Sequence, residues 1–183
     1  MKSTEANDLM QRMKLAKSAH IPLNTQDKIV IVIPGVPMPK QSVRSYDTGK
    51  RFINKKGKST AVIGHHQTNE LDYAKKKIEA DIAVQLPKGF IPWKGPVQVN
   101  RLAFVYEYLK SHKKAEREQY KTTGIPLPKW TRPDQVDNLK KLLFDCMSEM
   151  VYEDDAQVCY EKEIRRYYAD ESFTMIELQP LQL

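Results

Sequence analysis

Residues 132–166, RPDQVDNLKKLLFDCMSEMVYEDDAQVCYEKEIRR, give the clearest prediction of the fold. Apolar residues recur there at helical spacing, which predicts a helix over 135–150 after the start signals Pro133 and Asp134. The apolar stripe of that helix consists of Val136, Leu139, Leu143, Met147 and Met150, widened by Leu142 and Cys146. A turn and then a strand over 157–168 follow, because the β-branched and aromatic residues there are typical of strands.

Carboxylates gather at two points of this stretch. Asp134 and Asp137 lie at the helix start, Asp154 and Asp155 lie in the turn, and Lys141 follows Asp137 by one helical turn. Carboxylates brought together repel each other unless a cation lies between them, and oxygen ligands of this kind bind Mg²⁺. The pattern predicts a divalent-metal site, with a lysine placed to stabilise developing negative charge. The alternative is a helix cap, an ordinary i,i+4 ion pair and two turn residues.

Further elements are expected on both sides of this stretch. The β-branched run KIVIVIP at 28–34 predicts a strand, and residues 68–86 show the apolar stripe of a helix. Residues 97–108 predict the longest strand, with a slip in alternation near Arg101 that indicates a bulge. A last strand over 173–178 is expected to form a hairpin with the strand before it. The order predicts an α+β two-layer sandwich, a mixed β-sheet with two main helices (β-α-β-α-β-β).

Three segments are expected to lie outside the sandwich or on its surface. Residues 1–26 are interpreted as an N-terminal helical extension, which leaves 27–183 as the main domain. Residues 44–60 are expected to form a long basic loop. Residues 109–130 are expected to be a basic insertion with a short helix around 113–120.

Charge is divided unevenly along the chain. The net charge is +7, but residues 1–130 carry 24 Lys and Arg against 11 Asp and Glu, while residues 131–183 carry 6 against 12. A basic part attracts phosphates and an acidic part holds cations, which favours a metal-dependent enzyme acting on nucleic acid. The alternative is a basic protein whose charge serves solubility. The residues expected to contact DNA are Lys40, Arg44, Lys55, Lys56, Lys58, Lys113, Lys114 and Arg132.

The sequence indicates neither a membrane protein nor a secreted one. The longest apolar run, Ile29–Ile33, is too short to cross a bilayer, and Met1–Lys17 has no uninterrupted apolar core of the kind found in signal peptides. Cys146 and Cys159 lie outside any CxxC or Cys/His cluster. We therefore expect reduced thiols and a cytoplasmic protein.

The two acidic motifs together resemble the signature of the RusA family of Holliday-junction resolvases. RPDQVDNLKKLLFD followed by YEDDAQV is similar to the family pattern of Asp-x-Asp-Asn, a Lys three residues after the Asn, a Phe/Leu-Asp pair, and Asp-Asp-x-Gln-Val. The PGVPMPKQSVR loop after the first strand resembles the family's Pro-rich basic N-terminal segment. The similarity extends from Lys28 to the end of the chain.

This resemblance implies a small, phage- or prophage-encoded endonuclease that acts as a homodimer in DNA recombination and repair. It implies a requirement for Mg²⁺ (or Mn²⁺) and paired nicks at four-way DNA junctions. The positions that match the family residue by residue are Asp137, Asn138, Lys141, Asp145 and Asp155. The resemblance implies that Asp137 and Asp155 are catalytic metal ligands, that Lys141 is a catalytic lysine, and that Asp154 is an accessory ligand.

One departure from the family pattern concerns the first aspartate. The family has a single residue between the two helix-start aspartates, and this chain has two, Gln135 and Val136. Strict register from Asp137 puts Gln135 in the first ligand position, so either a small bulge lets Asp134 reach the metal or a ligand is lost. We expect Asp134 to be the ligand, since an extended segment after Pro133 can adjust. The alternative functions are a nuclease of the same fold that prefers flaps or forks, and a non-catalytic DNA-binding protein with a degraded metal site.

Overall fold

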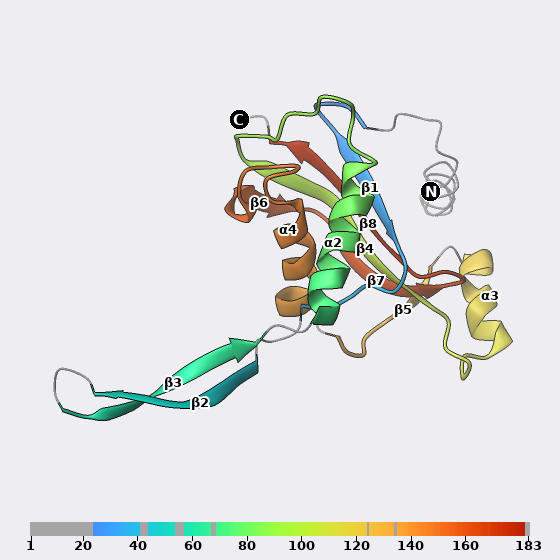
Figure 1. Ribbon diagram of the computed structural model, residues 1–183. Coiled ribbons are helices and arrows are strands. Elements are labelled where there is room, and N and C mark those ends of the chain that lie inside the picture. Colours follow the sequence, from blue (N-terminus) through green and yellow to red (C-terminus); the bar gives the residue numbers. More distant parts are fainter. Residues whose placement is uncertain are drawn as a thin grey trace.

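The computed structural model describes residues 24–40, 44–53, 57–66, 69–123, 125–133 and 135–181. Its centre is a mixed β-sheet (Figure 1). In order across the sheet, the strands are β1 (Ile29–Pro34), β8 (Phe173–Pro180), β4 (Val97–Glu107), β7 (Ile164–Ala169) and β5 (Leu127–Pro128). β4 runs antiparallel to β8 and parallel to β7, and the short strand β6 (Val158–Glu161) also pairs parallel with β4. The longest strand of this sheet therefore lies at its middle.

Helices cover one face of the sheet. α2 (Asn69–Ala83) and α4 (Lys141–Met147) pack against each other, and Figure 1 shows both in front of the sheet. α3 (Lys114–Thr123) lies beside β5, at the end of the sheet. The predicted α+β class with a mixed sheet is confirmed. The helix expected over 68–86 and the strands expected over 28–34 and 97–108 are confirmed to within a few residues.

Side-chain alternation along the strands divides the core into two clusters. Along β4, Leu102, Phe104 and Tyr106 belong to the large cluster between the sheet and the helices, whereas Ala103 and Val105 belong to a smaller cluster on the other face. Successive side chains of a strand point to opposite faces of the sheet. β1 and β8 alternate in the same way, so the sheet is apolar on both faces.

The strand order corrects one expectation. We expected the last two strands to pair as a hairpin, but β4 lies between β7 and β8. β4 is almost continuously buried, and such a strand is typical of an interior position with a neighbour on each side. The turn between β7 and β8 passes the end of β4, where the Glu107 N–H donates to Ser172 Oγ at 2.7 Å. The bulge expected near Arg101 is confirmed, because the register of β4 on β8 shifts between Val99 and Arg101.

The strand expected over 157–168 is divided in two. A single 3₁₀ turn, η2 (Asp155–Gln157), leads into β6, and β7 begins only at Ile164. Between them the Lys162 N–H donates to Val99 O and the Leu102 N–H donates to Glu163 O, each at 2.9 Å. The break therefore lies opposite the bulge in β4, and each irregularity accommodates the other.

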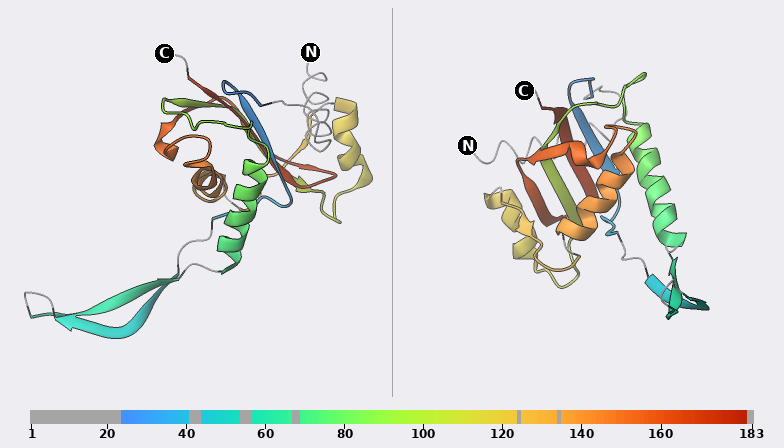
Figure 2. Two further views of the ribbon diagram at one scale, coloured as in Figure 1. Left: turned by 45° about the horizontal axis from the view of Figure 1, so that its top comes forward. Right: turned by 90° about the vertical axis from the view of Figure 1, so that its left-hand side faces the viewer.

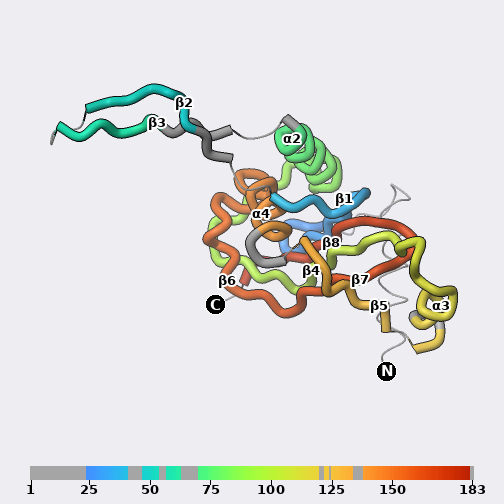
Figure 3. The backbone as a smooth tube through the Cα atoms, turned by 90° about the horizontal axis from the view of Figure 1, so that it is seen from below, coloured from blue at the N-terminus to red at the C-terminus, as the bar shows by residue number. Residues whose placement is uncertain are grey.

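A hairpin replaces most of the expected basic loop over 44–60. β2 (Arg44–Ile53) and β3 (Ser59–His66) pair antiparallel, with a register shift between Asp47 and Arg51. The Asp47 carboxylate accepts hydrogen bonds from the Arg51 guanidinium and the Gly49 N–H, which hold its pKa below the usual range. Figures 1 and 3 show this hairpin, which we call the arm, standing clear of the sheet and helices. The alternation of apolar and polar residues over this segment is weak, and its many basic residues favoured the prediction of a loop over that of two strands.

The N-terminal extension expected over 1–26 lies almost wholly outside the described residues, so it and the 27–183 domain boundary stay predictions. Its last residues are described and contact the main body. Asn24 Nδ2 donates to Gln85 O at 2.7 Å, and Trp93 Nε1 donates to Gln26 O at 2.6 Å. Within the described ranges, every helix is too short or too polar to span a membrane.

Candidate active site

The helix that carries the first acidic motif changes its winding along its length. A π-helical segment, η1 (Gln135–Lys140), runs directly into α4, which ends at Met147. A π-turn pairs each N–H with the carbonyl five residues back, so it takes up one residue more than an α-helical turn. The extra residue between Asp134 and Asp137 coincides with this π-turn. The single helix expected over 135–150 is therefore corrected to a π segment followed by a short α-helix.

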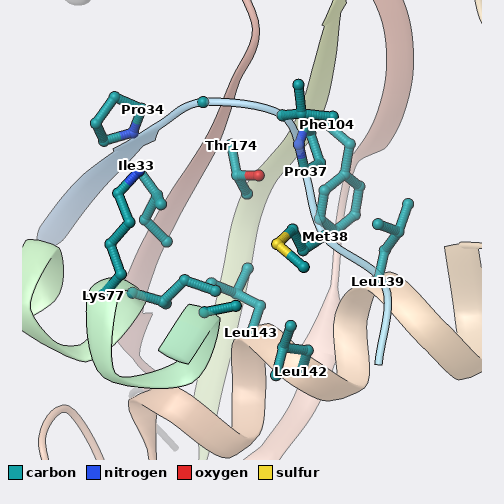
Figure 4. A pocket seen from close by; sticks show the side chains of 14 residues that line it. Ile33, Pro34, Pro37, Met38, Lys77, Phe104, Leu139, Leu142, Leu143 and Thr174 are labelled. Atoms are coloured by element: carbon teal, nitrogen blue, oxygen red, sulfur yellow. The ribbon is translucent and has the colours of Figure 1, made fainter. Parts of the chain in front are cut away.

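A Pro-rich loop after β1 lies over this helix. Gly35 has a φ of 102°, a left-handed conformation that glycine adopts without strain, and it turns the chain out of β1. The loop then covers an apolar pocket of about 230 Å³. Figure 4 shows Met38 pointing into this pocket above Leu142 and Leu143 of α4. These apolar contacts fix the loop to α4 and bring Lys40 to the π-turn.

Lys40 contacts the helix through its backbone and its side chain. Its N–H donates to the Asn138 carbonyl at 2.9 Å, and its ammonium group forms an ion pair with Asp145. Both side chains are half-buried, so salt screens this pair less than an exposed one. Lys40 and Asp145 thus hold the loop on the helix. The expected contact of Lys40 with DNA stays a prediction.

Residues 129–133, which we call the strap, connect β5 to the acidic helix. Arg166 of β7 donates from Nη1 to Thr131 O at 3.3 Å and also to Pro133 O. In return, the Lys129 N–H donates to Arg166 O at 3.0 Å. One arginine therefore holds the strap at both ends, up to the residue that precedes Asp134.

Two tyrosines lie against the first residue of the strap. Lys129 Nζ is 4.6 Å from the ring centroid of Tyr106 and 5.3 Å from that of Tyr168, and it donates to the Tyr168 hydroxyl at 3.3 Å. Burial raises the pKa of Tyr106 to about 12, an effect that the nearby Arg166 charge partly offsets. Tyr106 is therefore neutral at physiological pH, and Lys129 and Arg166 make this edge of the sheet basic.

The second acidic pair occupies η2. The Asp154 carboxylate caps this turn by accepting the Ala156 N–H at 2.8 Å, and the Gln157 side chain accepts the Asp154 N–H at 2.8 Å. Asp155 follows as an exposed residue, and its carboxylate forms no hydrogen bond or ion pair with any residue that the structure describes. Since η2 contacts α4, Asp155 offers an available carboxylate beside the acidic helix.

Tyr152 fixes the turn against α4. Its side chain is fully buried, and its hydroxyl donates to Phe144 O at 3.1 Å. Burial raises the pKa of Tyr152, and the negative charges of Asp155 and Asp145 raise it further. The hydroxyl therefore remains a hydrogen-bond donor across the physiological range, which keeps the two acidic motifs at a fixed separation.

The remaining candidate catalytic residues lie at the start of the same helix. Lys141 is the exposed first residue of α4, and it forms no ion pair within the described part of the chain. Asp137 has a described backbone in η1, but its side chain, like the whole of Asp134, lies outside the described residues. Among the described side chains, no three carboxylate, histidine or cysteine groups lie close enough to hold a metal. The ligand set therefore stays a prediction.

Two of the expected DNA contacts, Arg44 and Lys58, lie in the described part of the arm. Lys58 is exposed where β3 begins, and Arg44 is the first residue of β2, although its side chain lies outside the described part. Lys55 and Lys56 are not among the described residues. The basic charge of this segment is thus presented on a projecting two-stranded ribbon, a shape that fits a groove of duplex DNA.

The other expected DNA contacts lie on the main body. Lys113 and Lys114 are exposed at the start of α3, where the Lys113 N–H donates to Glu116 Oε2 at 2.7 Å. Arg132 is exposed in the strap. Figure 2 shows α3 and the arm at different ends of the molecule. A DNA ligand that touches both would therefore have to be extended or branched.

Two residues near the site were not predicted from the sequence. Arg166 and Lys129 fix the strap, but their roles depend on the pairing of β5 with β7, which brings together residues far apart in the chain. The only local signal was the run KWTR at 129–132, a tryptophan between basic residues directly before the acidic motif.

The family model described as Endodeoxyribonuclease RusA matches residues 34–179, which include the arm, the strap and both acidic motifs. The chain belongs to the RusA family. Membership of this RusA family marks the protein as an endodeoxyribonuclease of the Holliday-junction-resolving kind, which acts on branched DNA. No curated protein matched the chain.

Proposed function

We propose that this RusA-family protein is a Mg²⁺-dependent endonuclease that nicks paired strands of four-way DNA junctions in recombination or repair. The observation that carries the proposal is that an exposed carboxylate, Asp155, and an exposed amine, Lys141, lie on two elements in contact. Neither group is engaged by another described residue. Available charged groups on fixed elements are what a catalytic site requires.

The proposed metal ligands are Asp137 and Asp155, with Asp134 completing the set and Asp154 in an accessory role. This donor set is entirely carboxylate oxygen, which fits Mg²⁺ and also Mn²⁺. A bound Mg²⁺ supplies charge neutralisation on the phosphoryl oxygens and lowers the pKa of a bound water. Asp154 accepts a backbone N–H as a cap, which leaves its second carboxylate oxygen for the accessory role.

Lys141 is proposed to act on the phosphodiester through its ammonium charge. The group is placed at the first residue of α4, and its exposure leaves it accessible to a phosphate. An ammonium group stabilises the negative charge that develops on phosphoryl and leaving oxygens in the transition state. The half-buried ion pair of Lys40 with Asp145 and the Arg166 contacts to the strap hold the backbone around this group.

Substrate binding is proposed to use the arm, α3 and the strap, and two copies of the chain. Basic residues on these elements would contact phosphates, which supply most of the affinity of nucleic-acid binding. A homodimer would place two sites on a junction that has two equivalent strands to cut.

The deciding experiment compares labelled four-way junctions, flaps, forks and linear duplex, each with Mg²⁺ or with EDTA. We expect paired nicks in the four-way junction with Mg²⁺ and none with EDTA. Junction binding without any Mg²⁺-dependent cutting would contradict the enzyme assignment. Faster cutting of flaps or forks than of four-way junctions would replace the proposed substrate.

Substitution of the proposed ligands gives a second test. We expect Asp137→Asn and Asp155→Asn to reduce cutting by about a hundredfold or more while junction binding is retained, because each removes charge from the metal site alone. Asp170→Asn, which changes an exposed turn aspartate between β7 and β8, is the matched control and should cut normally. Gel-shift assays in EDTA and circular dichroism measure binding and folding. Loss of binding in the ligand variants would contradict the assignment.

A further inference from the structure

Trp130 is the most prominent exposed aromatic residue near the acidic helix. Its side chain is 77% exposed, whereas the second tryptophan of the chain, Trp93, is 6% exposed. Among the described residues, none stacks on the Trp130 indole. Isolated exposed apolar residues are common and need no explanation by themselves. The anchored backbone of the strap and the basic residues around Trp130 are what indicate a ligand for its exposed ring.

The strap holds Trp130 outward on a fixed backbone. On one side of it, the Lys129 N–H donates to Arg166 O at 3.0 Å and Lys129 Nζ lies over the Tyr106 ring. On the other side, the Thr131 carbonyl accepts from Arg166 at 3.3 Å, and Thr131 Oγ1 accepts from Lys129 Nζ at 2.8 Å. An anchored backbone reduces the entropy lost when the indole is covered.

The charges around Trp130 favour nucleic acid as the group that covers it. Arg132 is exposed two residues after Trp130, and Lys129 immediately precedes Trp130. The Arg166 guanidinium contacts the backbone of the strap. A second copy docking through this face would bring two basic straps together, and like charges repel. Basic residues around an aromatic ring are typical of sites where bases stack and phosphates are contacted.

We propose that Trp130 stacks on an unpaired or unstacked nucleobase at the branch point of the DNA and so favours branched over linear substrates. The inference rests on the proposed function, since the strap leads directly into the acidic helix. Bases inside a continuous duplex are paired and stacked, so their faces are closed to an indole. At a branch point the cost of exposing a base face is smaller. Stacking there adds affinity that linear duplex cannot supply.

The test measures binding to four-way junctions and to linear duplex in EDTA for the wild type and three variants. Trp130→Ala removes the ring, and Trp130→Phe keeps an aromatic face. Tyr73→Ala removes a 73% exposed aromatic side chain from α2 and is the matched control. Tryptophan fluorescence is recorded in the same titrations. Because Trp93 is buried, quenching by DNA reports on Trp130.

We expect Trp130→Ala to lose roughly tenfold or more in junction affinity with little change on duplex, whereas Trp130→Phe and Tyr73→Ala stay close to the wild type. Junction DNA should quench the wild-type fluorescence and leave that of Trp130→Phe unchanged. Equal losses on junction and duplex, or a dissociated oligomer in Trp130→Ala, would overturn the stacking role. Unchanged junction affinity of Trp130→Ala, in a wild type that cuts junctions, would overturn it and leave the nuclease assignment intact. A wild type that does not bind junctions would overturn both.

Discussion

At the scale of single residues, Arg166 connects the sheet to the acidic motif. Its guanidinium donates to two strap carbonyls, and its own carbonyl accepts the Lys129 N–H. A residue with these contacts acts as a positioning residue, since it touches the backbone that leads to Asp134 rather than the reacting atoms.

We expect Arg166→Met to lower thermal stability and to raise the Mg²⁺ concentration needed for half-maximal cutting. Two carbonyls lose a charged donor, which costs about 1–3 kcal/mol, and the strap is released beside the proposed ligands. Arg165→Met is the matched control, because Arg165 is the exposed neighbour and pairs with Glu163 instead. Thermal unfolding and Mg²⁺ titrations of junction cutting measure the two effects. Equal behaviour of the two variants would contradict the positioning role.

Cys146 gives a prediction about alkaline pH. Burial raises the pKa of its thiol to about 12, above the value of an exposed thiol. From about pH 9 to 12 the unfolded chain is ionised at this cysteine while the folded chain is not. The free energy of unfolding should therefore fall as pH rises through this window, with a contribution of about 1.4 kcal/mol per pH unit from this residue, and stay level below it.

Urea unfolding from pH 8 to pH 11 measures that slope. Cys146→Ala should show a smaller fall with pH than the wild type, although its stability at pH 8 will be lower because a buried side chain is shortened. Cys159→Ala, at the exposed cysteine, should retain the wild-type slope. Identical slopes in all three proteins would contradict the buried neutral thiol.

At the scale of elements, the π-turn of η1 is the feature that decides the register of the acidic helix. An extra residue in an α-helix rotates everything on one side of it by about 100°. A π-turn takes up that residue locally, so both flanking segments keep their faces. The apolar stripe is buried as the helical spacing predicts, from Leu139 in η1 to Met147 in α4.

Deleting Gln135 should therefore convert η1 to an α-helical turn and leave the melting temperature unchanged or higher. Inserting one alanine after Lys141 should instead rotate α4 against the sheet and unfold the protein or lower its melting temperature by many degrees.

Asp134→Asn should reduce cutting strongly, and Gln135→Ala should not, because we expect Asp134 to be the ligand. Differential scanning calorimetry and junction-cutting rates measure these outcomes. A Gln135 deletion as damaging as the insertion would show that the π-turn does not absorb the extra residue.

At the scale of the whole molecule, the arm is nearly independent of the body. β2 and β3 pair with each other, and the views from different sides show them projecting beyond the sheet and helices. The arm exposes Phe52 and Ile53 together with basic residues, and a ribbon of this kind adds reach rather than stability.

We expect a variant in which residues 45–65 are replaced by a short Gly-Ser linker to melt at the wild-type temperature but to bind junctions more weakly. The slope of log K against log salt should become shallower by about 2 to 3, because fewer counterions are released from phosphates. A second variant, Lys50→Gln with Lys58→Gln, keeps the arm and removes charge. If the basic residues of the arm contact phosphates, the slope of log K against log salt becomes shallower in both variants. An unchanged slope in the shortened variant would exclude the arm from DNA binding.

The sequence by itself determined the class of fold and the composition of the candidate site. Helical and strand periodicity are local properties, so β1, β4, α2 and the buried stripe of α4 follow from the spacing of apolar residues along the chain. The two acidic motifs and Lys141 are likewise contiguous in sequence, and they carry the family resemblance that the match over residues 34–179 confirms.

Only the tertiary structure decided how these pieces meet. β4 lies between β7 and β8 because a strand with two apolar faces is buried best in the interior of a sheet, and no local pattern states which strand its neighbours will be. Arg166 reaches the strap across about thirty-five residues of chain, and the Lys40 N–H reaches the Asn138 carbonyl of the π-turn across about one hundred. Such contacts depend on the register of strands and on helix packing. For that reason the residues of the acidic helix predicted its chemistry, whereas the contacts of Arg166 and Lys40 that hold the helix in place could not be predicted from the sequence.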